Sequence, residues 1–288
     1  MRKHQTAAGI LHSATVLVTF LAVVFLTGPA PSALGQITAF GAPAPFIEDS
    51  IATETSPGPA PQVSTAELRS LLSSGLAVLI DARPPAEFGM SHIPGAVNVA
   101  PKPGVPLSVY VSDVEEVKRL VADRSQLLVL YCNGPFCGKS KRLAAELDAA
   151  GYTNLRRYQL GMPGWRTTGG VAVIEVDQMR EVAKLDRTAV FVDAGLGDSA
   201  AGRKFGHHRL VRIATATQAE MEVAKNDGRL PINDHNTRMV VIGANAAQAI
   251  TIARLIAANA FHNVSYYDGD GDRLLADRRS ATGVRDQG

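Results

Sequence analysis

The sequence has few residues of several chemically distinctive kinds. Its 288 residues include only two cysteines and one tryptophan, and aromatic residues make up 6%. The formal net charge is +2 at pH 7, and no basic patch is interleaved with aromatic residues. Nucleic acid is therefore not expected as a partner, because phosphate backbones are bound by clustered positive charge. The hydrophobic content of 46% suffices for packed cores, and the length allows about two domains.

Long apolar segments are also missing beyond the N-terminus. The one candidate, residues 14–26, follows the cationic residues Arg2 and Lys3 and precedes the small-residue sequence Ala33-Leu34-Gly35. This order is typical of a secretory signal peptide, which we assign to residues 1–35. The apolar core is short for a membrane-spanning helix, which needs about 20 residues. We expect a periplasmic or secreted protein, and the alternative is a membrane anchor formed by an uncleaved N-terminal segment.

Metal-binding patterns are incomplete. His207 and His208 have no cysteine or acidic helix residue at ligand spacing, so we expect them on the surface or in a loop. The acidic run 268–272 resembles a calcium loop, but Arg279 stands where such a loop carries its twelfth-position glutamate, which favours a turn. We expect neither a metal nor a cofactor.

The rest of the chain divides into a linker, two similar segments and a tail. Residues 36–62 are rich in proline, alanine, serine and threonine, which predicts a flexible linker, with an ordered arm as the alternative. Residues 63–170 and 171–275 form a weak internal repeat, and residues 276–288 form the tail. In each copy apolar strands alternate with helical patterns, and the first strand ends in Asp-Ala. This alternation predicts an α/β fold with parallel sheets.

The most informative stretch is the apolar run 127–131, which ends at Cys132. A short loop containing glycine and proline follows, and then a basic helix begins near Ser140. A thiol that faces loop amides and a helix N-terminus lies in a positive field, which favours the nucleophilic thiolate. The alternative is that Cys132 is a small buried residue at the end of a strand.

Motifs on both sides of this loop resemble those of the rhodanese (sulfurtransferase) family. Asp81 and Arg83 match its Asp-x-Arg, residues 87–96 match its Glu-Phe-x-x-Gly-His-Ile-Pro-Gly-Ala with Ser91 in place of the glycine, and Gly161 with Trp165 matches its Gly-Gly-x-x-x-Trp with Leu160 in place of the first glycine. The resemblance covers about residues 63–170. Together with the internal repeat, it implies two rhodanese-like domains, each a parallel sheet flanked by helices on both faces, of which the first is catalytic.

The resemblance also implies roles for the loop. Cys132 would attack the outer sulfur of a small anionic donor such as thiosulfate, become a persulfide and pass the sulfur to a thiol or cyanide acceptor. Asp81 and Arg83 would hold loops in place and would not touch substrate. The expected substrate-binding residues are Asn133, Gly134, Phe136, Cys137, Gly138, Lys139 and Ser140.

The second copy lacks the nucleophile. Alignment of the helices at Ala144 and Ala253 places Gly243 opposite Cys132, and Gly195 stands where the first copy has Arg83. We expect residues 171–275 to be an inactive domain that supports the first one and offers a surface to a protein partner.

Cys137 leaves several interpretations open. It would form a disulfide with Cys132 in an oxidising compartment, resolve a modified Cys132, or remain a free spectator thiol. Two other functions compete with sulfur transfer: a non-catalytic binding or scaffold protein, and a thiol-disulfide redox protein that uses Cys132 and Cys137. The spacing is not the Cys-x-x-Cys of typical redox motifs. Phosphatase chemistry is disfavoured, because Gly138 occupies the position where cysteine-dependent phosphatases carry an arginine.

Overall fold

The computed structural model describes residues 60–101, 113–197 and 204–276. The predicted signal peptide, the linker up to residue 59 and the tail from residue 277 lie outside the described residues. No helix among those that are described has both the length and the apolar character needed to cross a membrane.

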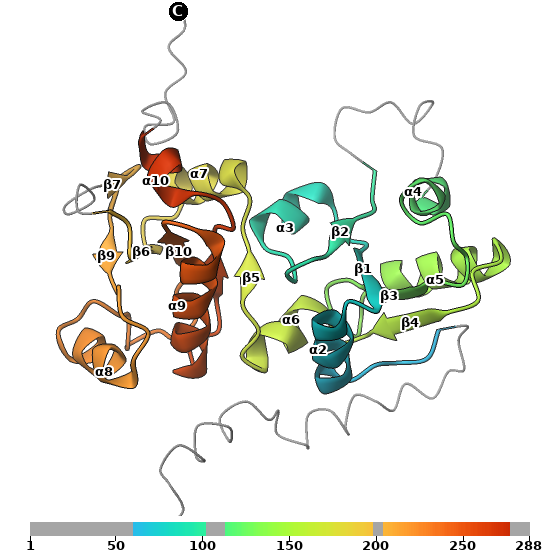
Figure 1. The fold of residues 1–288 in the computed structure, drawn as a ribbon, viewed down its shortest axis with the longest axis horizontal. Coiled ribbons are helices and arrows are strands. Elements are labelled where there is room, and N and C mark those ends of the chain that lie inside the picture. Colours follow the sequence, from blue (N-terminus) through green and yellow to red (C-terminus); the bar gives the residue numbers. More distant parts are fainter. Residues whose placement is uncertain (1–59, 102–112, 198–203, 277–288) are drawn as a thin grey trace, which may run out of the picture. The chain divides into compact units, whose positions relative to one another are not determined.

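The first half of the described chain forms a parallel sheet with the strand order β2-β1-β3-β4 (Figure 1). Its strands are β1 (Ala77–Asp81), β2 (Val97–Asn98), β3 (Leu127–Tyr131) and β4 (Leu155–Tyr158). The central strands β1 and β3 are almost continuously apolar, as expected for parallel strands that are covered on both faces. Gln62, which the sequence placed in the linker, forms a parallel bridge to Arg157 of β4.

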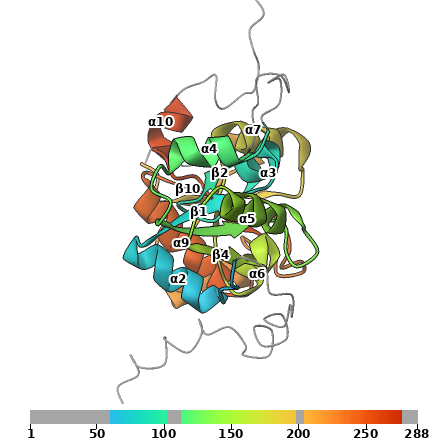
Figure 2. The ribbon, with the colours of Figure 1, turned by 90° about the vertical axis from the view of Figure 1, so that its right-hand side faces the viewer.

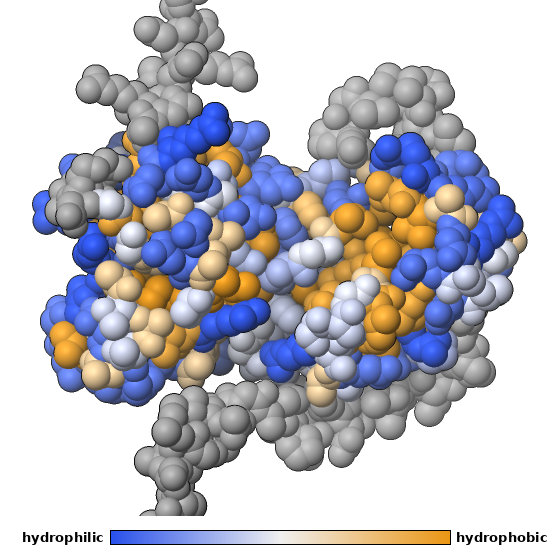
Figure 3. Space-filling model, viewed as in Figure 1, coloured by the Kyte–Doolittle hydropathy of each residue, from blue (hydrophilic) through white to orange (hydrophobic). Residues whose placement is uncertain are grey.

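Successive strand residues point to opposite faces of the sheet. Both faces carry apolar side chains, and helices cover both of them. Helices α4 (Asp113–Leu120) and α5 (Lys139–Ala149) pack on the face that carries Leu128 and Leu130. Helices α2 (Thr65–Ser74) and α6 (Gly161–Thr167) pack on the face that carries Val129 and Tyr131 (Figure 2). The short helix α3 (Pro85–Met90) follows β1. On the face drawn in Figure 3, apolar residues gather over this first body.

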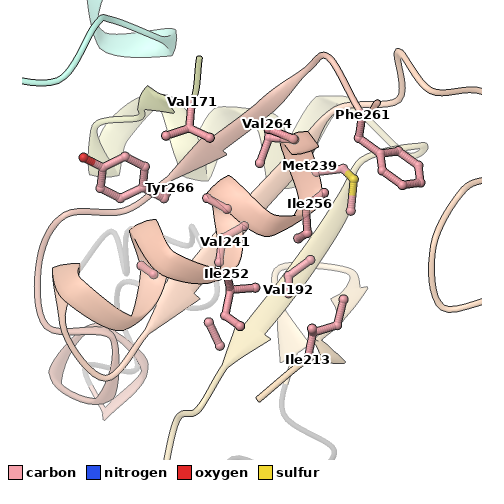
Figure 4. Close-up of a cluster of buried hydrophobic side chains, with 14 of the residues drawn as sticks. Val171, Val192, Ile213, Met239, Val241, Ile252, Ile256, Phe261, Val264 and Tyr266 are labelled. Atoms are coloured by element: carbon pink, nitrogen blue, oxygen red, sulfur yellow. The ribbon is translucent and has the colours of Figure 1, made fainter. Parts of the chain in front are cut away.

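The second half forms a parallel sheet with the order β5-β11-β10-β6-β9. Helices α8 and α9 cover one face and α7 and α10 the other. Figure 4 shows Ile252 and Ile256 of α9 packed near Val192 and Val241 of the strands. The strands of this sheet are β5 (Ala172–Val173), β6 (Val190–Ala194), β9 (Val211–Arg212), β10 (Met239–Gly243) and β11 (Val264–Tyr266). The helices are α7 (Val176–Leu185), α8 (Gln218–Asn226), α9 (Ala246–Ala258) and α10 (Gly271–Ala276). A separate antiparallel hairpin is formed by β7 (Lys204–Phe205) and β8 (His208–Arg209).

The strand registers of the two sheets correspond residue by residue. Asp81 pairs with Tyr131 in the first sheet as Asp193 pairs with Ile242 in the second, so Cys132 and Gly243 occupy the same position. The other matching pairs are Ile80–Val97 with Val192–Val211, Leu128–Leu155 with Met239–Val264, and Gln62–Arg157 with Val173–Tyr266. The predicted α/β class, with two parallel sheets flanked by helices, is confirmed.

Each sheet has an aspartate near the end of a central strand, Asp81 in β1 and Asp193 in β6, and each aspartate has an arginine partner. The arginine comes from a different position in the two sheets. In the first sheet Arg83 binds Asp81. Gly195 replaces that arginine in the second sheet, and Arg212 binds Asp193 from the neighbouring strand at 3.3 Å. Arg212 stands at the position of Asn98, which pairs with Asp81 in the same register. The second copy therefore retains the buried carboxylate and its charge partner.

The second half also contacts the first through backbone hydrogen bonds. The amide of His92 donates to the carbonyl of Val173 in β5 at 3.0 Å, and the reverse bond is 2.9 Å. The amide of Glu175 donates to the carbonyl of Gly89 in α3 at 2.8 Å, and Met90 packs against the core of the second half. Helix α3 belongs to the first half, but residues of the second half, which lie far from it in the sequence, help to hold it in place.

The remaining polar motifs have structural roles. The His208 ring lies 4.8 Å from the Phe191 ring, and His207 is exposed. The Asp270 carboxylate accepts a hydrogen bond from the amide of Arg273 at 2.8 Å and so caps α10, while Asp272 accepts one from Gly197. Within the described ranges, no group of three or more metal-ligating side chains is placed to hold a metal ion.

A matched pair of glycines offers a test of this correspondence. Gly161 begins α6 with a φ of +57° and packs on the Cys132 carbonyl, and Gly271 begins α10 and packs on the Gly243 carbonyl. A Cβ at either position would overlap that backbone oxygen. We expect Gly161→Ala and Gly271→Ala each to lower the free energy of unfolding by about 1–3 kcal/mol, as overpacking typically does.

Only Gly161→Ala should also slow the alkylation of Cys132, since only that glycine touches the Cys132 loop. Denaturant unfolding and the rate of iodoacetamide modification measure the two effects. Equal loss of Cys132 reactivity in both variants would contradict the local role assigned to Gly161.

A second test removes residues after Gly170. The shortened chain loses the Val173 partner of His92, the Glu175 partner of Gly89 and the Val171 carbonyl that accepts from the Trp165 indole at 2.8 Å. We expect a clearly lower Tm in calorimetry, with about 4–8 °C lost for each kcal/mol in a domain of this size. An unchanged Tm would show that the first body does not depend on these contacts.

Candidate active site

Cys132 lies directly after the central strand β3 and before helix α5, at the carboxyl end of the first sheet. Its side chain is buried, with 2% of its surface exposed. The Cys132 Sγ lies 3.6 Å from the Ser140 Oγ, and the thiol donates to the Cys137 carbonyl at 3.3 Å. Ser140 is buried in the first turn of α5. The apolar strand and the basic helix of the sequence thus place a thiol against a helix start, as predicted.

Residues 132–138 form a loop that turns back on itself. The Cys137 amide donates to the Gly134 carbonyl at 3.0 Å, and Gly134 has a φ of +103°, which favours glycine. The Cys132 carbonyl accepts from the Met162 amide of α6 at 3.2 Å. The turn between Gly134 and Cys137 brings Cys137 back towards Cys132. The bond between Met162 and Cys132 fixes the first residue of the loop to α6.

The Cys132 thiol is less acidic than the sequence suggested. Burial raises the pKa of Cys132, and hydrogen bonding with Cys137 raises it further, while the amide and hydroxyl of Ser140 act in the opposite direction. The expectation of a thiolate favoured by a positive field is therefore wrong for the free thiol. The physical reason is that the sulfur is desolvated and faces the negative end of the Cys137 carbonyl dipole.

Cys137 is the more acidic thiol of the pair. Burial acts to raise the pKa of Cys137, but the Cys132 side chain, the amides of Asn133 and Lys139 and the Lys139 charge outweigh it, so the pKa of Cys137 lies below its usual value. The side chain is half-buried, and both cysteines are free thiols in the structure.

The other predicted loop residues are only partly gathered around the thiols. Ser140 contacts Cys132, and the backbone of Lys139 serves Cys137. The Phe136 side chain is fully exposed, and the Asn133 amide turns away to donate to the Glu87 Oε2 at 2.5 Å. Gly138 is exposed at the N-cap of α5.

Glu87 was not expected at the site, although it belongs to the Glu-Phe motif that the sequence displayed. Through Asn133 it ties α3 to the Cys132 loop. Since α3 is also held by Glu175, the second half reaches the loop indirectly through this helix.

A buried polar cluster holds the strand ends beside Cys132. Arg83 binds the Asp81 carboxylate and donates to the Ser91 carbonyl at 2.5 Å. Its guanidinium lies 5.7 Å from the centre of the Tyr131 ring, whose hydroxyl accepts from the Ile93 amide at 3.1 Å. These contacts are structural, in agreement with the role expected for Asp81 and Arg83.

The corresponding position in the second half has no space for a thiol. Residues 244–245 alone connect β10 to α9, and the Asn245 side chain caps α9 by accepting from the Gln248 amide at 3.1 Å. A Cβ on Gly243 would lie 2.7 Å from the Ala249 amide nitrogen. The short loop therefore leaves no room for a side chain at Gly243, the position that Cys132 occupies in the first half.

A cavity of about 870 Å³ lies away from the Cys132 loop. It is lined by residues of α2, α6, α9 and the segments beside them, including Arg69, Trp165 and Arg254. None of its lining residues belongs to the Cys132 loop. We therefore place the candidate site at the loop that carries Cys132 and Cys137, and not at this cavity.

Comparisons with known proteins identify the first half. The model of the rhodanese-like domain matches residues 64–168. A human thiosulfate:glutathione sulfurtransferase is 34% identical over 111 residues, which cover 37% of this chain and 93% of that protein. An HTH-type transcriptional regulator of Mycobacterium tuberculosis is 31% identical over 111 residues, which cover 38% of this chain and 44% of the regulator.

A solved thiosulfate sulfurtransferase of Pseudomonas aeruginosa is similar at 19% identity with a TM-score of 0.33, covering 81% of this chain and 47% of that one. The chain thus spans less than half the length of the mycobacterial regulator and of the Pseudomonas protein. It spans nearly the whole of the human relative, and residues 64–168, which the family model matches, contain Cys132 and the predicted substrate-binding residues. The chain belongs to the rhodanese-like family of sulfurtransferases.

Proposed function

We propose that the protein is an exported sulfurtransferase that moves sulfane sulfur from thiosulfate, or a similar anionic donor, to a thiol or cyanide acceptor. The observation that carries this proposal is the position of Cys132 between the end of β3 and the first turn of α5, with Ser140 beside its sulfur. The printed name of the human relative, thiosulfate:glutathione sulfurtransferase, supports thiosulfate as donor and a small thiol as acceptor.

The reaction takes two steps. The Cys132 thiolate attacks the outer sulfur of thiosulfate, a sulfur–sulfur bond forms on Cys132, and sulfite leaves with the electron pair of the broken bond. An acceptor thiolate or cyanide then attacks the outer sulfur of the persulfide and regenerates the Cys132 thiolate. The Ser140 amide and hydroxyl stabilise negative charge on the sulfur in both steps, because they donate towards it.

The cellular setting and partners rest on the sequence. The cationic start, the apolar core at residues 14–26 and the small residues before Gln36 favour export to the periplasm, with membrane attachment only if this segment remains uncleaved. The near-neutral charge disfavours nucleic acid. The second half, which fixes α3 and carries no thiol, is the part available to a protein partner.

Substitution of the nucleophile tests this function directly. Cys132→Ser should abolish thiosulfate-dependent sulfur transfer and leave the Tm nearly unchanged, because a hydroxyl is a poor nucleophile of similar size. In the wild-type protein, mass spectrometry after thiosulfate should locate added sulfur on Cys132. The reaction should accelerate as the pH rises, since burial raises the pKa of Cys132 and only the thiolate attacks.

If activity survives in Cys132→Ser but is lost in Cys137→Ser, the nucleophile is Cys137 and not Cys132. Absence of any adduct with sulfane donors would favour a binding protein instead.

A thiol introduced into the second half should not replace Cys132. Gly243→Cys in the Cys132→Ser background should restore no sulfur transfer, because a Cβ at this position meets the Ala249 amide and the Asn245 carbonyl. The same substitution should destabilise the chain by about 1–3 kcal/mol through overpacking. Measurable transfer by this variant would show that the short loop opens enough to form a site.

A further inference from the structure

The proposed reaction uses Cys132 alone and leaves the second thiol of the loop without a role. Cys137 lies in the same loop, and its backbone carbonyl accepts from the Cys132 thiol at 3.3 Å, so residue 137 lies against the Cys132 sulfur. The turn from Gly134 to Cys137 creates this proximity. A second thiol in this loop is more than the transfer of sulfur to an external acceptor requires.

We infer that Cys137 resolves the Cys132 persulfide by attacking the Cys132 Sγ, so that a Cys132–Cys137 disulfide forms and hydrosulfide is released. The inference rests on the proposed function, because it needs the persulfide as its starting point. It gives the protein a further activity: one molecule of thiosulfate is converted to sulfite and sulfide at the expense of the two thiols of the loop.

The step balances without an oxidant from outside. The Cys137 sulfur supplies the electron pair of the new bond to the Cys132 Sγ, and the bond between that Sγ and the outer sulfur breaks. The outer sulfur leaves with the electron pair as hydrosulfide and takes up the proton. The sulfane sulfur is thereby reduced and the two cysteine thiols are oxidised. A reducing dithiol of the periplasm or the medium must reopen the disulfide before the next turnover.

Geometry favours attack on the inner sulfur by a group of the protein itself. The Cys132 Sγ is buried, so an external acceptor meets the outer sulfur first, whereas the backbone of Cys137 already lies 3.3 Å from the Sγ and keeps the Cys137 side chain in the same loop. Thiol exchange is faster when the attacking group is a thiolate and the leaving group is a weak base. Cys137 is the more acidic thiol, and hydrosulfide is a better leaving group than the desolvated Cys132 thiolate.

The length of the loop makes this possible only in the first half. Residues 132–138 include Gly134, whose φ of +103° allows the chain to reverse before α5. The connection 244–245 in the second half has no corresponding turn. The longer loop thus accommodates a second sulfur where the inactive copy has only a helix cap.

A single-turnover experiment on the full-length protein tests the inference. The reduced protein, freed of reductant under anaerobic conditions, is mixed with thiosulfate; sulfite, sulfide and the intact mass are then measured. The wild type should release sulfite and sulfide in equal amounts and end as an internal disulfide. Cys137→Ser should release sulfite but at least about tenfold less sulfide, since the intramolecular attack is lost, and should retain the persulfide on Cys132. Cys132→Ser should release neither product.

The outcomes separate the two proposals. A wild-type protein that holds a stable Cys132 persulfide and releases no sulfide overturns this inference and leaves the proposed function intact. A wild-type protein that releases no sulfite and gains no sulfur overturns the proposed function. Sulfide release by Cys137→Ser at the wild-type rate would also overturn the inference, and its Tm, measured in parallel, shows whether the variant is folded.

Discussion

A buried carboxylate at the end of the first central strand is the constraint on which the rest of each sheet depends. Asp81 is fully buried and holds Arg83, which in turn binds the Ser91 carbonyl and lies over Tyr131, the residue before Cys132. An unpaired charge there would be costly, since breaking a buried ion pair costs about 3–5 kcal/mol. The second sheet keeps Asp193 and draws its arginine from another strand, Arg212.

The two halves share registers but differ in the connection that follows the matching central strand: the first has a loop with Cys132, and the second has a short turn without a thiol. The same strand pairing positions Cys132 and Gly243. The longer loop 132–138 carries both thiols, while in the second half Asn245 caps α9 two residues after Gly243, where a Cβ would meet the backbone of α9. Parallel sheets tolerate such changes, because loops at the carboxyl ends of strands contribute little to the core.

Burial and hydrogen bonding give the two thiols different pKa values. Cys132 is protected and has a raised pKa, and Cys137 is more accessible with a lowered pKa. A helix start alone does not produce a reactive thiolate when the sulfur is desolvated and faces a carbonyl oxygen. In the proposed reaction, the negative charge of the donor or of a persulfide would be stabilised by the Ser140 amide and hydroxyl.

The sequence by itself determined the parallel strands, the flanking helices, the position of Cys132 after a buried strand and the loss of a thiol in the second half. Those features follow from apolar runs such as residues 127–131 and from local residue identity. Only the tertiary structure decided which thiol is more acidic, where Asn133 turns and how Glu87 and Glu175 reach the loop through α3. These depend on burial and on contacts between residues far apart in the chain, for which spacing along the sequence carries no signal.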